Sequence, residues 1–251
     1  MIVYHGSDKK IESPIYGYGR DDNDYGSGFY TTEDVERARQ WAVANGSALS
    51  VCNKYQLDMS GLDVLRLDDC GTLTWIAEVI YHRGVNDTQI SYIARAICEK
   101  YKLDTSSYDI IIGYRADDSY TKVVDAFLYN NINIDEVERF FKKGELGQQI
   151  FIKSEKAFEQ LEFIESEIVT DKKKYEGYDV EARRYVERFL DERSRQIQLD
   201  GYEPIGITAR VAIQKRFAYD KKVGYFIPFY ARDKNKYLYN DNNKSMRRTR
   251  R

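Results

Sequence analysis

Two stretches, MIVYHGSD at residues 1–8 and DYGSGFYTT at residues 24–32, decide how this chain is interpreted. Each is a short apolar run beside a Gly-Ser pair, which predicts strands over 2–5 and 27–31. The loop between them is rich in glycine and aspartate and too polar to belong to a core. His5, one of only two histidines in the chain, stands at the end of the first strand. The question is why one of the two histidines stands there, directly before a Gly-Ser pair.

The segment after residue 32 has apolar residues at helical spacing, which predicts a helix with Thr32 as its N-cap. Further helices are predicted over 72–83, 89–101, 119–130, 134–143, 154–163, 178–198 and around 204–217. Further strands are predicted over 48–58, 62–68, 108–115, 148–154, 164–169 and 223–231, with a Ser-Gly turn joining the first two. Helices and strands alternate without regular βαβ units. This order predicts an α+β fold, with a mixed or antiparallel sheet flanked by helices.

The chain has 251 residues, enough for one large domain or for a domain with a smaller appendage. The lysine-rich stretch at 171–175 is the predicted boundary. It divides a domain at 1–170 from a helical and β-containing extension at 171–251, which ends in the basic tail KSMRRTRR. No run approaches the roughly twenty apolar residues of a membrane span, and the N-terminus lacks the pattern of a secretory leader. We therefore expect a soluble, cytoplasmic protein without a membrane partner.

Composition and motifs exclude several function classes. A formal net charge of −2 argues against a nucleic-acid site that covers the whole surface. The three cysteines never form C-x-x-C and the two histidines are too few for zinc, so neither a disulfide framework nor a metal site is predicted. The sequence also lacks a phosphate-binding loop, a dinucleotide glycine fingerprint, G-x-S-x-G and H-E-x-x-H. The 22 tyrosines suit half-exposed grooves and interfaces.

The order of the motifs is more specific than any one of them. YHGS, followed by YGSGFYTT and a helix, resembles the His-Tyr-Glu branch of the ADP-ribosyltransferases, which includes diphtheria-toxin-like enzymes and poly-ADP-ribose polymerases. With YDIIIGYRADDSY and GQQIFIKSEKAFEQLEF added, the chain resembles more closely the bacterial domain-of-unknown-function family 3990, which groups with that superfamily. The resemblance covers about residues 1–165. It implies a split mixed and antiparallel sheet core, NAD⁺ as substrate and no metal.

The resemblance also implies roles for individual residues. His5 would hydrogen-bond the adenosine-side ribose, the backbone of Gly6 would pair with the nicotinamide carboxamide, and Ser7 would add a hydroxyl contact to the same ribose. Each has a structural alternative. A lone strand histidine is often a structural hydrogen-bonder, and glycine suits any close approach of the backbone.

Aromatic and cationic residues complete the implied NAD⁺ site. Tyr30 would stack on the nicotinamide, and Trp41 stands where that branch carries a second stacking ring. Arg20, in the loop between the two motifs, is placed to pair with a phosphate. Alternatively, the two rings belong to the core and Arg20 pairs with one of the neighbouring aspartates.

The third signature position departs from the family pattern. Aligned on the strand and helix of GQQIFIKSEKA, the expected glutamate falls on Gln149, with Gln148 as the neighbouring choice and Glu145 further upstream. Glutamine can hydrogen-bond a ribose hydroxyl but brings no negative charge to a cationic transition state. Asp117 and Asp118, in RADDSY, are either site residues or a helix N-cap.

These observations predict an NAD⁺-dependent mono-ADP-ribosyltransferase that modifies an intracellular protein or nucleic acid. By resemblance it would be a bacterial toxin, effector or phage-defence protein with a small neutralising antitoxin partner. Two alternatives remain open: a catalytically inactive fold that binds a nucleotide or a protein, and an NAD⁺ glycohydrolase.

Overall fold

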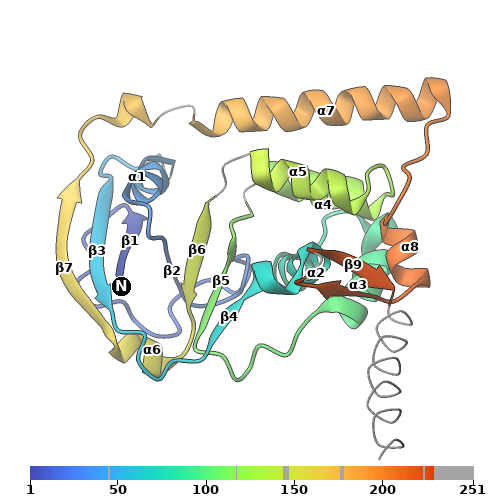
Figure 1. The fold of residues 1–251 in the computed structure, drawn as a ribbon. Coiled ribbons are helices and arrows are strands. Elements are labelled where there is room, and N and C mark those ends of the chain that lie inside the picture. Colours follow the sequence, from blue (N-terminus) through green and yellow to red (C-terminus); the bar gives the residue numbers. More distant parts are fainter. Residues whose placement is uncertain (45, 117, 144–146, 176–177, 223, 229–251) are drawn as a thin grey trace, which may run out of the picture.

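A computed structural model describes the chain except for residues 45, 117, 144–146, 176–177, 223 and 229–251 (Figure 1). The described residues form an α+β fold, as predicted. The antiparallel sheet has the strand order β1 (Ile2–Ser7), β3 (Val51–Leu57), β7 (Leu161–Ile168). The mixed sheet has the order β2 (Phe29–Thr31), β6 (Gln148–Ile152), β5 (Ile110–Tyr114), β4 (Val64–Arg66), with β4 and β5 parallel. A hairpin joins β8 (Phe217–Asp220) to β9 (Tyr225–Pro228).

Helices flank both sheets. They are α1 (Val35–Ala44), α2 (Thr72–Arg83), α3 (Ser91–Tyr101), α4 (Asp118–Leu128), α5 (Ile134–Lys143), α6 (Glu155–Glu159), α7 (Tyr178–Asp200) and α8 (Ala209–Gln214). In Figure 1, α1 lies beside the antiparallel sheet, α2 to α5 and α8 gather beyond the mixed sheet, and α7 runs along the top. No helix in the described part of the chain is long and apolar enough to cross a membrane.

Buried side chains of the two large sheets pack together in one core cluster, and an isolated bridge joins their backbones. Tyr4 of β1 and Thr32, just after β2, exchange two backbone hydrogen bonds of 2.8 and 2.9 Å. Beyond this bridge the backbone ladder stops, and the ring of His5 takes its place: Nδ1 lies 2.7 Å from the carbonyl oxygen of Tyr30. The sheets therefore part at His5, and the strand ends on either side of this split face one another.

The C-terminal part shares the largest core cluster. Val186 of α7, Ala212 of α8 and Phe226 of β9 are buried together with residues of α2 to α5. A buried ion pair adds to this packing, since Arg193 of α7 donates to Glu136 of α5 at 2.5 Å. The predicted boundary at 171–175 coincides with a short 3₁₀ turn, Lys172–Lys174.

Local capping differs from the prediction at the first helix. Thr32 is not the N-cap of α1, because the helix begins at Val35 and the side chain of Asp34 accepts from the N–H groups of Glu36 and Arg37. The Thr32 hydroxyl oxygen instead accepts from the N–H of Asp34, 3.2 Å away. Thr32 thus follows the strand, and Asp34 caps the helix.

Two other element predictions were wrong in extent. The helix expected over 154–163 ends at Glu159, because the next residues pair with β3 as strand β7. The strands expected over 48–58 and 62–68 form as β3 and β4 with a turn at 60–61 between them, and they lie in different sheets. The helix expected over 204–217 is limited to α8, since Phe217 pairs with Pro228 across the hairpin.

Candidate functional site

A cavity of about 570 Å³ lies at the split between the sheets. All seven residues predicted as site residues line it: His5, Gly6, Ser7, Arg20, Tyr30, Trp41 and Gln149. They come from β1, the loop before β2, β2 itself, α1 and β6. Residues distant in sequence thus converge on one concave surface of a size usual for small-molecule sites.

His5 forms one wall of the cavity. Its Nδ1 faces a carbonyl oxygen, which only accepts, so Nδ1 carries the proton and Nε2 of the neutral ring is a hydrogen-bond acceptor. The ring packs against Phe29, with ring centroids 4.3 Å apart. Burial lowers the pKa of His5, and the hydrogen bond to Tyr30 opposes this only in part. The ring is therefore neutral near pH 7.

The lowered pKa of His5 predicts a pH dependence of folding. As the pH falls below about 6.5, the unfolded chain takes up a proton that the folded ring does not, so the free energy of unfolding decreases. Above that pH the ring is neutral in both states, and the contribution of His5 to stability is fully present. The slope is at most about 1.4 kcal/mol per pH unit for each such histidine. Burial, and Lys102 after it, also lower the pKa of His82, which therefore contributes in the same direction.

Urea unfolding at pH 7, 6 and 5 of the wild type, His5→Gln and His82→Gln checks this. We expect each variant to lose less stability toward acid than the wild type does. Equal losses in the wild type and His5→Gln would contradict the assignment for His5.

Tyr30 fixes, by hydrogen bonds, the loop before β2 that contributes Asp24 to the cavity. Its hydroxyl donates to the carbonyl of Gly26 at 2.8 Å and accepts from the N–H of Tyr25 at 3.0 Å. Its ring packs on Phe151, with centroids 4.8 Å apart. Burial raises the pKa of the Tyr30 hydroxyl, so it stays protonated. Tyr30 therefore contributes an aromatic ring to the cavity while its hydroxyl is used within the loop.

Gly6 and Ser7 line the cavity, but both also have structural reasons for their identity. A Cβ atom at Gly6 would lie 2.0 Å from the carbonyl oxygen of Ala38, so α1 packs directly on the backbone of β1. The Ser7 hydroxyl donates to the Lys9 carbonyl and accepts from the Lys9 N–H and the Asn53 amide. Its hydrogen-bonding capacity is filled, which argues against a direct ribose contact.

Trp41 lies on α1, the helix that the spacing of apolar residues predicts after residue 32. The guanidinium of Arg115 lies 5.5 Å from its ring centroid, a cation–π contact. Among the described residues, no acceptor reaches the buried indole Nε1–H. An unsatisfied buried donor is costly, so a ligand acceptor at this point would be favoured.

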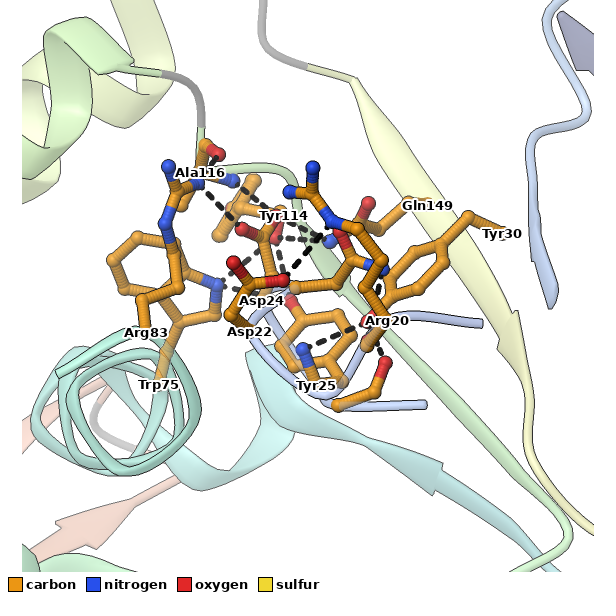
Figure 2. Close-up of polar contacts among 12 residues, drawn as sticks. Arg20, Asp22, Asp24, Tyr25, Tyr30, Trp75, Arg83, Tyr114, Ala116 and Gln149 are labelled. Carbon is orange, nitrogen blue, oxygen red and sulfur yellow. Dashed lines mark hydrogen bonds and ion pairs between the residues drawn. The ribbon is translucent and has the colours of Figure 1, made fainter. Parts of the chain in front are cut away.

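Gln149 is buried in β6, and Gln148 is exposed. The Gln149 amide donates to Oδ2 of Asp24 at 2.9 Å, as Figure 2 shows. Gln148 donates to Asp68 and does not line the cavity. Of the two glutamines considered for the third signature position, Gln149 is the one at the site. Glu145 and Asp117 lie outside the described residues, and Asp118 begins α4.

Sequence reasoning missed four charged residues of the cavity: Asp24, Arg83, Arg115 and Arg183. Asp24 accepts from Arg83 at 2.9 Å and from the backbone N–H of Ala116 at 2.8 Å (Figure 2). Arg115 directly follows the buried strand β5, a position that could have signalled it. Nothing in the sequence marks Asp24 or Arg183, since one lies in a polar loop and the other on a highly charged helix.

The cavity is therefore cationic overall. Among the described lining residues, four are arginines (Arg20, Arg83, Arg115, Arg183) and one, Asp24, is an acid. Arg20 pairs with the exposed Asp22 at 3.0 Å, the alternative considered for it, and still lines the cavity. Guanidinium groups pair well with phosphates and carboxylates, so this charge balance favours an anionic ligand.

Metal ligands are not grouped in the described part of the chain, where no cluster of three or more His, Cys, Asp or Glu side chains is arranged to hold an ion. Comparison with curated proteins and with solved structures finds no match to this chain. The family model described as "Protein of unknown function (DUF3990)" matches residues 1–163. This span contains every cavity residue except Arg183. The chain therefore belongs to the DUF3990 family.

Proposed function

We propose that this protein binds NAD⁺ in the cavity at the sheet split and transfers its ADP-ribose group to a macromolecule, as a mono-ADP-ribosyltransferase. One observation carries the proposal: His5, Tyr30 and Gln149, chosen from the order of sequence motifs, line the same cavity. They stand on β1, β2 and β6, on both sides of the split. A split between two sheets is also the arrangement that the resemblance implies.

The charge of the cavity supports a dinucleotide. The pyrophosphate of NAD⁺ carries two negative charges, and the lining arginines offer planar, permanently charged donors for it. Arg115 is held over the Trp41 ring, and Arg183 reaches the cavity from α7. These two are the best candidates for phosphate contacts, because Arg83 and Arg20 each bind an aspartate of the loop.

The aromatic residues support binding of the nicotinamide end. Tyr30 and Trp41 both line the cavity, and ring stacking contributes about 0.5–1.5 kcal/mol beyond area burial. The Nε1–H of Trp41, which has no acceptor among the described residues, is a donor for a ligand oxygen. Nε2 of His5 would accept a hydrogen bond from a ribose hydroxyl.

The reaction breaks the bond between C1′ of the ribose and the nicotinamide nitrogen. The bonding electron pair leaves with the nitrogen, which gives neutral nicotinamide and a cationic, oxocarbenium-like ribose, as in other glycosidic cleavages. The nucleophile of the acceptor supplies the electron pair of the new bond to C1′ and then loses its proton. Bound and oriented NAD⁺ is the main requirement for this step.

The identity of the acceptor follows from the family resemblance alone. We propose an intracellular protein or nucleic acid as the acceptor and a small antitoxin protein as the partner. If water takes the place of the acceptor, the same site acts as an NAD⁺ glycohydrolase. A catalytically inactive binding module is the other candidate, favoured by the uncharged Gln149.

One experiment separates these functions. The full-length protein is incubated with NAD⁺ labelled in its ADP-ribose part, with and without cell lysate, and binding is measured by calorimetry. Label on a macromolecule supports transfer. Free ADP-ribose without a labelled macromolecule supports hydrolysis, and binding without cleavage supports the inactive module. Absence of NAD⁺ binding would overturn both enzyme functions and leave only a module that binds another nucleotide or a protein.

Arg183→Ala tests the proposed phosphate contact from α7. We expect about tenfold weaker NAD⁺ binding, because a charge-assisted hydrogen bond contributes about 1.5–3 kcal/mol. The loss of conformational entropy when the exposed arginine side chain is ordered offsets part of this gain. Affinity should also fall less steeply with added salt than in the wild type. The matched control is Arg184→Ala, which removes an exposed neighbour on α7 that does not line the cavity. Equal effects of the two substitutions would contradict the contact.

A further inference from the structure

The carboxylate of Asp24 is buried at the edge of the cavity, beside Gln149. We infer that Asp24 positions the amide of Gln149 and supplies the negative charge that a glutamine at the third signature position lacks. The inference rests on the proposed function, because it concerns cleavage of NAD⁺ in this cavity. It identifies a positioning residue that the sequence pattern does not indicate.

The hydrogen bonds of Gln149 fix the orientation of its amide. Nε2 lies 2.9 Å from Oδ2 of Asp24 and 3.4 Å from the carbonyl oxygen of Tyr114 (Figure 2). Both partners are acceptors, so the NH₂ group must face them, and Oε1 points the other way. Gln149 lines the cavity, which makes Oε1 the acceptor that it offers to a ligand hydroxyl.

Asp24 is itself held in place from three sides. Its Oδ1 accepts from Arg83, and its Oδ2 accepts from the backbone N–H of Ala116 as well as from Gln149. Its loop is closed by the hydroxyl of Tyr30, which bonds the adjacent Tyr25 N–H and the Gly26 carbonyl. Burial raises the pKa of Asp24, and these three donors oppose that rise by favouring the carboxylate. The negative charge of Asp24 is thus linked to the Gln149 amide by one hydrogen bond.

This arrangement suits the bond that breaks. As nicotinamide leaves C1′ with the electron pair, positive charge grows on the ribose, and Oε1 of Gln149 would accept the hydrogen bond of its 2′-hydroxyl. A fixed negative charge in a water-poor site stabilises that growing cation without reorganising. Asp24 supplies the negative charge and Gln149 supplies the acceptor for the hydroxyl. In the His-Tyr-Glu pattern, one glutamate side chain supplies both.

Exchanging the two groups tests the inference. In Asp24→Asn, one acceptor oxygen must serve three donors, so the Gln149 amide loses its fixed orientation and the charge is gone. In the double variant Asp24→Asn with Gln149→Glu, the charge moves to residue 149, and the asparagine NH₂ can donate to it. The control is Asp21→Asn, the same chemical change at an exposed position in the same loop that does not line the cavity. Nicotinamide release, NAD⁺ affinity and the urea midpoint are measured for each full-length protein.

We expect Asp24→Asn to lower kcat about 100-fold with a much smaller change in NAD⁺ affinity. The double variant should recover at least tenfold of that loss, and Asp21→Asn should match the wild type. Unchanged kcat in Asp24→Asn would overturn the inference. It would also be overturned if the double variant folded and bound NAD⁺ but recovered nothing, since Asp24 would then only support the loop. A wild type that releases no nicotinamide would overturn the proposed function, and the role of Asp24 with it.

Discussion

Tyr30→Ala is expected to weaken NAD⁺ binding roughly 100-fold, because it removes both the buried area of the ring and its stacking on the ligand. The substitution also removes the hydroxyl that joins Gly26 to Tyr25, so the loop carrying Asp24 loses its closure. Calorimetric titration with NAD⁺ measures the effect.

Tyr30→Phe is the matched control for this substitution. It keeps the ring against Phe151 and deletes only the two hydrogen bonds of the hydroxyl. We expect affinity within a few-fold of the wild type and a stability loss of about 1–2 kcal/mol. If Tyr30→Ala binds NAD⁺ as tightly as Tyr30→Phe, the ring does not contact the ligand.

Gly6→Ala is expected to destabilise the fold by about 3 kcal/mol or more, at or above the upper end of ordinary overpacking. The added Cβ would lie 2.0 Å from the Ala38 carbonyl oxygen and 2.6 Å from the Ala42 nitrogen. Both are backbone atoms of α1 and cannot rotate aside, so the helix must move off β1. Because α1 carries Trp41, the cavity would be distorted as well.

Urea unfolding compares Gly6→Ala with Gly61→Ala. Apart from its chain neighbours, no atom of the described residues lies within 4 Å of a Cβ at Gly61, whose φ of +72° causes only local backbone strain. That strain costs about 1–2 kcal/mol for alanine. Equal losses in the two variants would show that the close approach of α1 to β1 carries no special cost.

Much of the candidate site could be predicted because its signature residues lie on strands that recognisable motifs mark in a fixed order along the chain. His5 and Tyr30 each lie on a strand close to a Gly-Ser pair, and Gln149 lies near the start of β6, the strand before α6. The roles expected of these residues remain predictions. Their convergence on one cavity was already implied by the order of the sequence motifs.

Asp24 could not have been singled out in the same way. In the sequence it is one of four neighbouring acidic or amide residues in RDDNDYG, a composition typical of solvated loops. Its burial to 6% exposure arises from contacts distant in sequence, with Arg83 and Gln149. Local patterns carry no signal for such contacts.

The errors in secondary structure have a similar origin. The segment from Glu155 to Phe163 has helical spacing throughout, yet residues from Leu161 onward add to the edge of β3. Tertiary pairing outweighs local propensity there, since alternate residues of the strand gain backbone hydrogen bonds with partners about a hundred positions away. The long charged helix, by contrast, was predicted almost to its ends, because its length alone excludes a strand.

Helix α7 adds a residue from outside the family span to the cavity. The family span, 1–163, provides every lining residue but one, and Arg183 is the exception. That arginine reaches the site from a helix whose ion pair and buried residues, Arg193 and Val186, lie on its C-terminal side. Substitution of Arg183 would therefore change the charge of the cavity while every lining residue of the family span stays unaltered. One arginine outside that span can thus tune the proposed anion site without a change in either sheet.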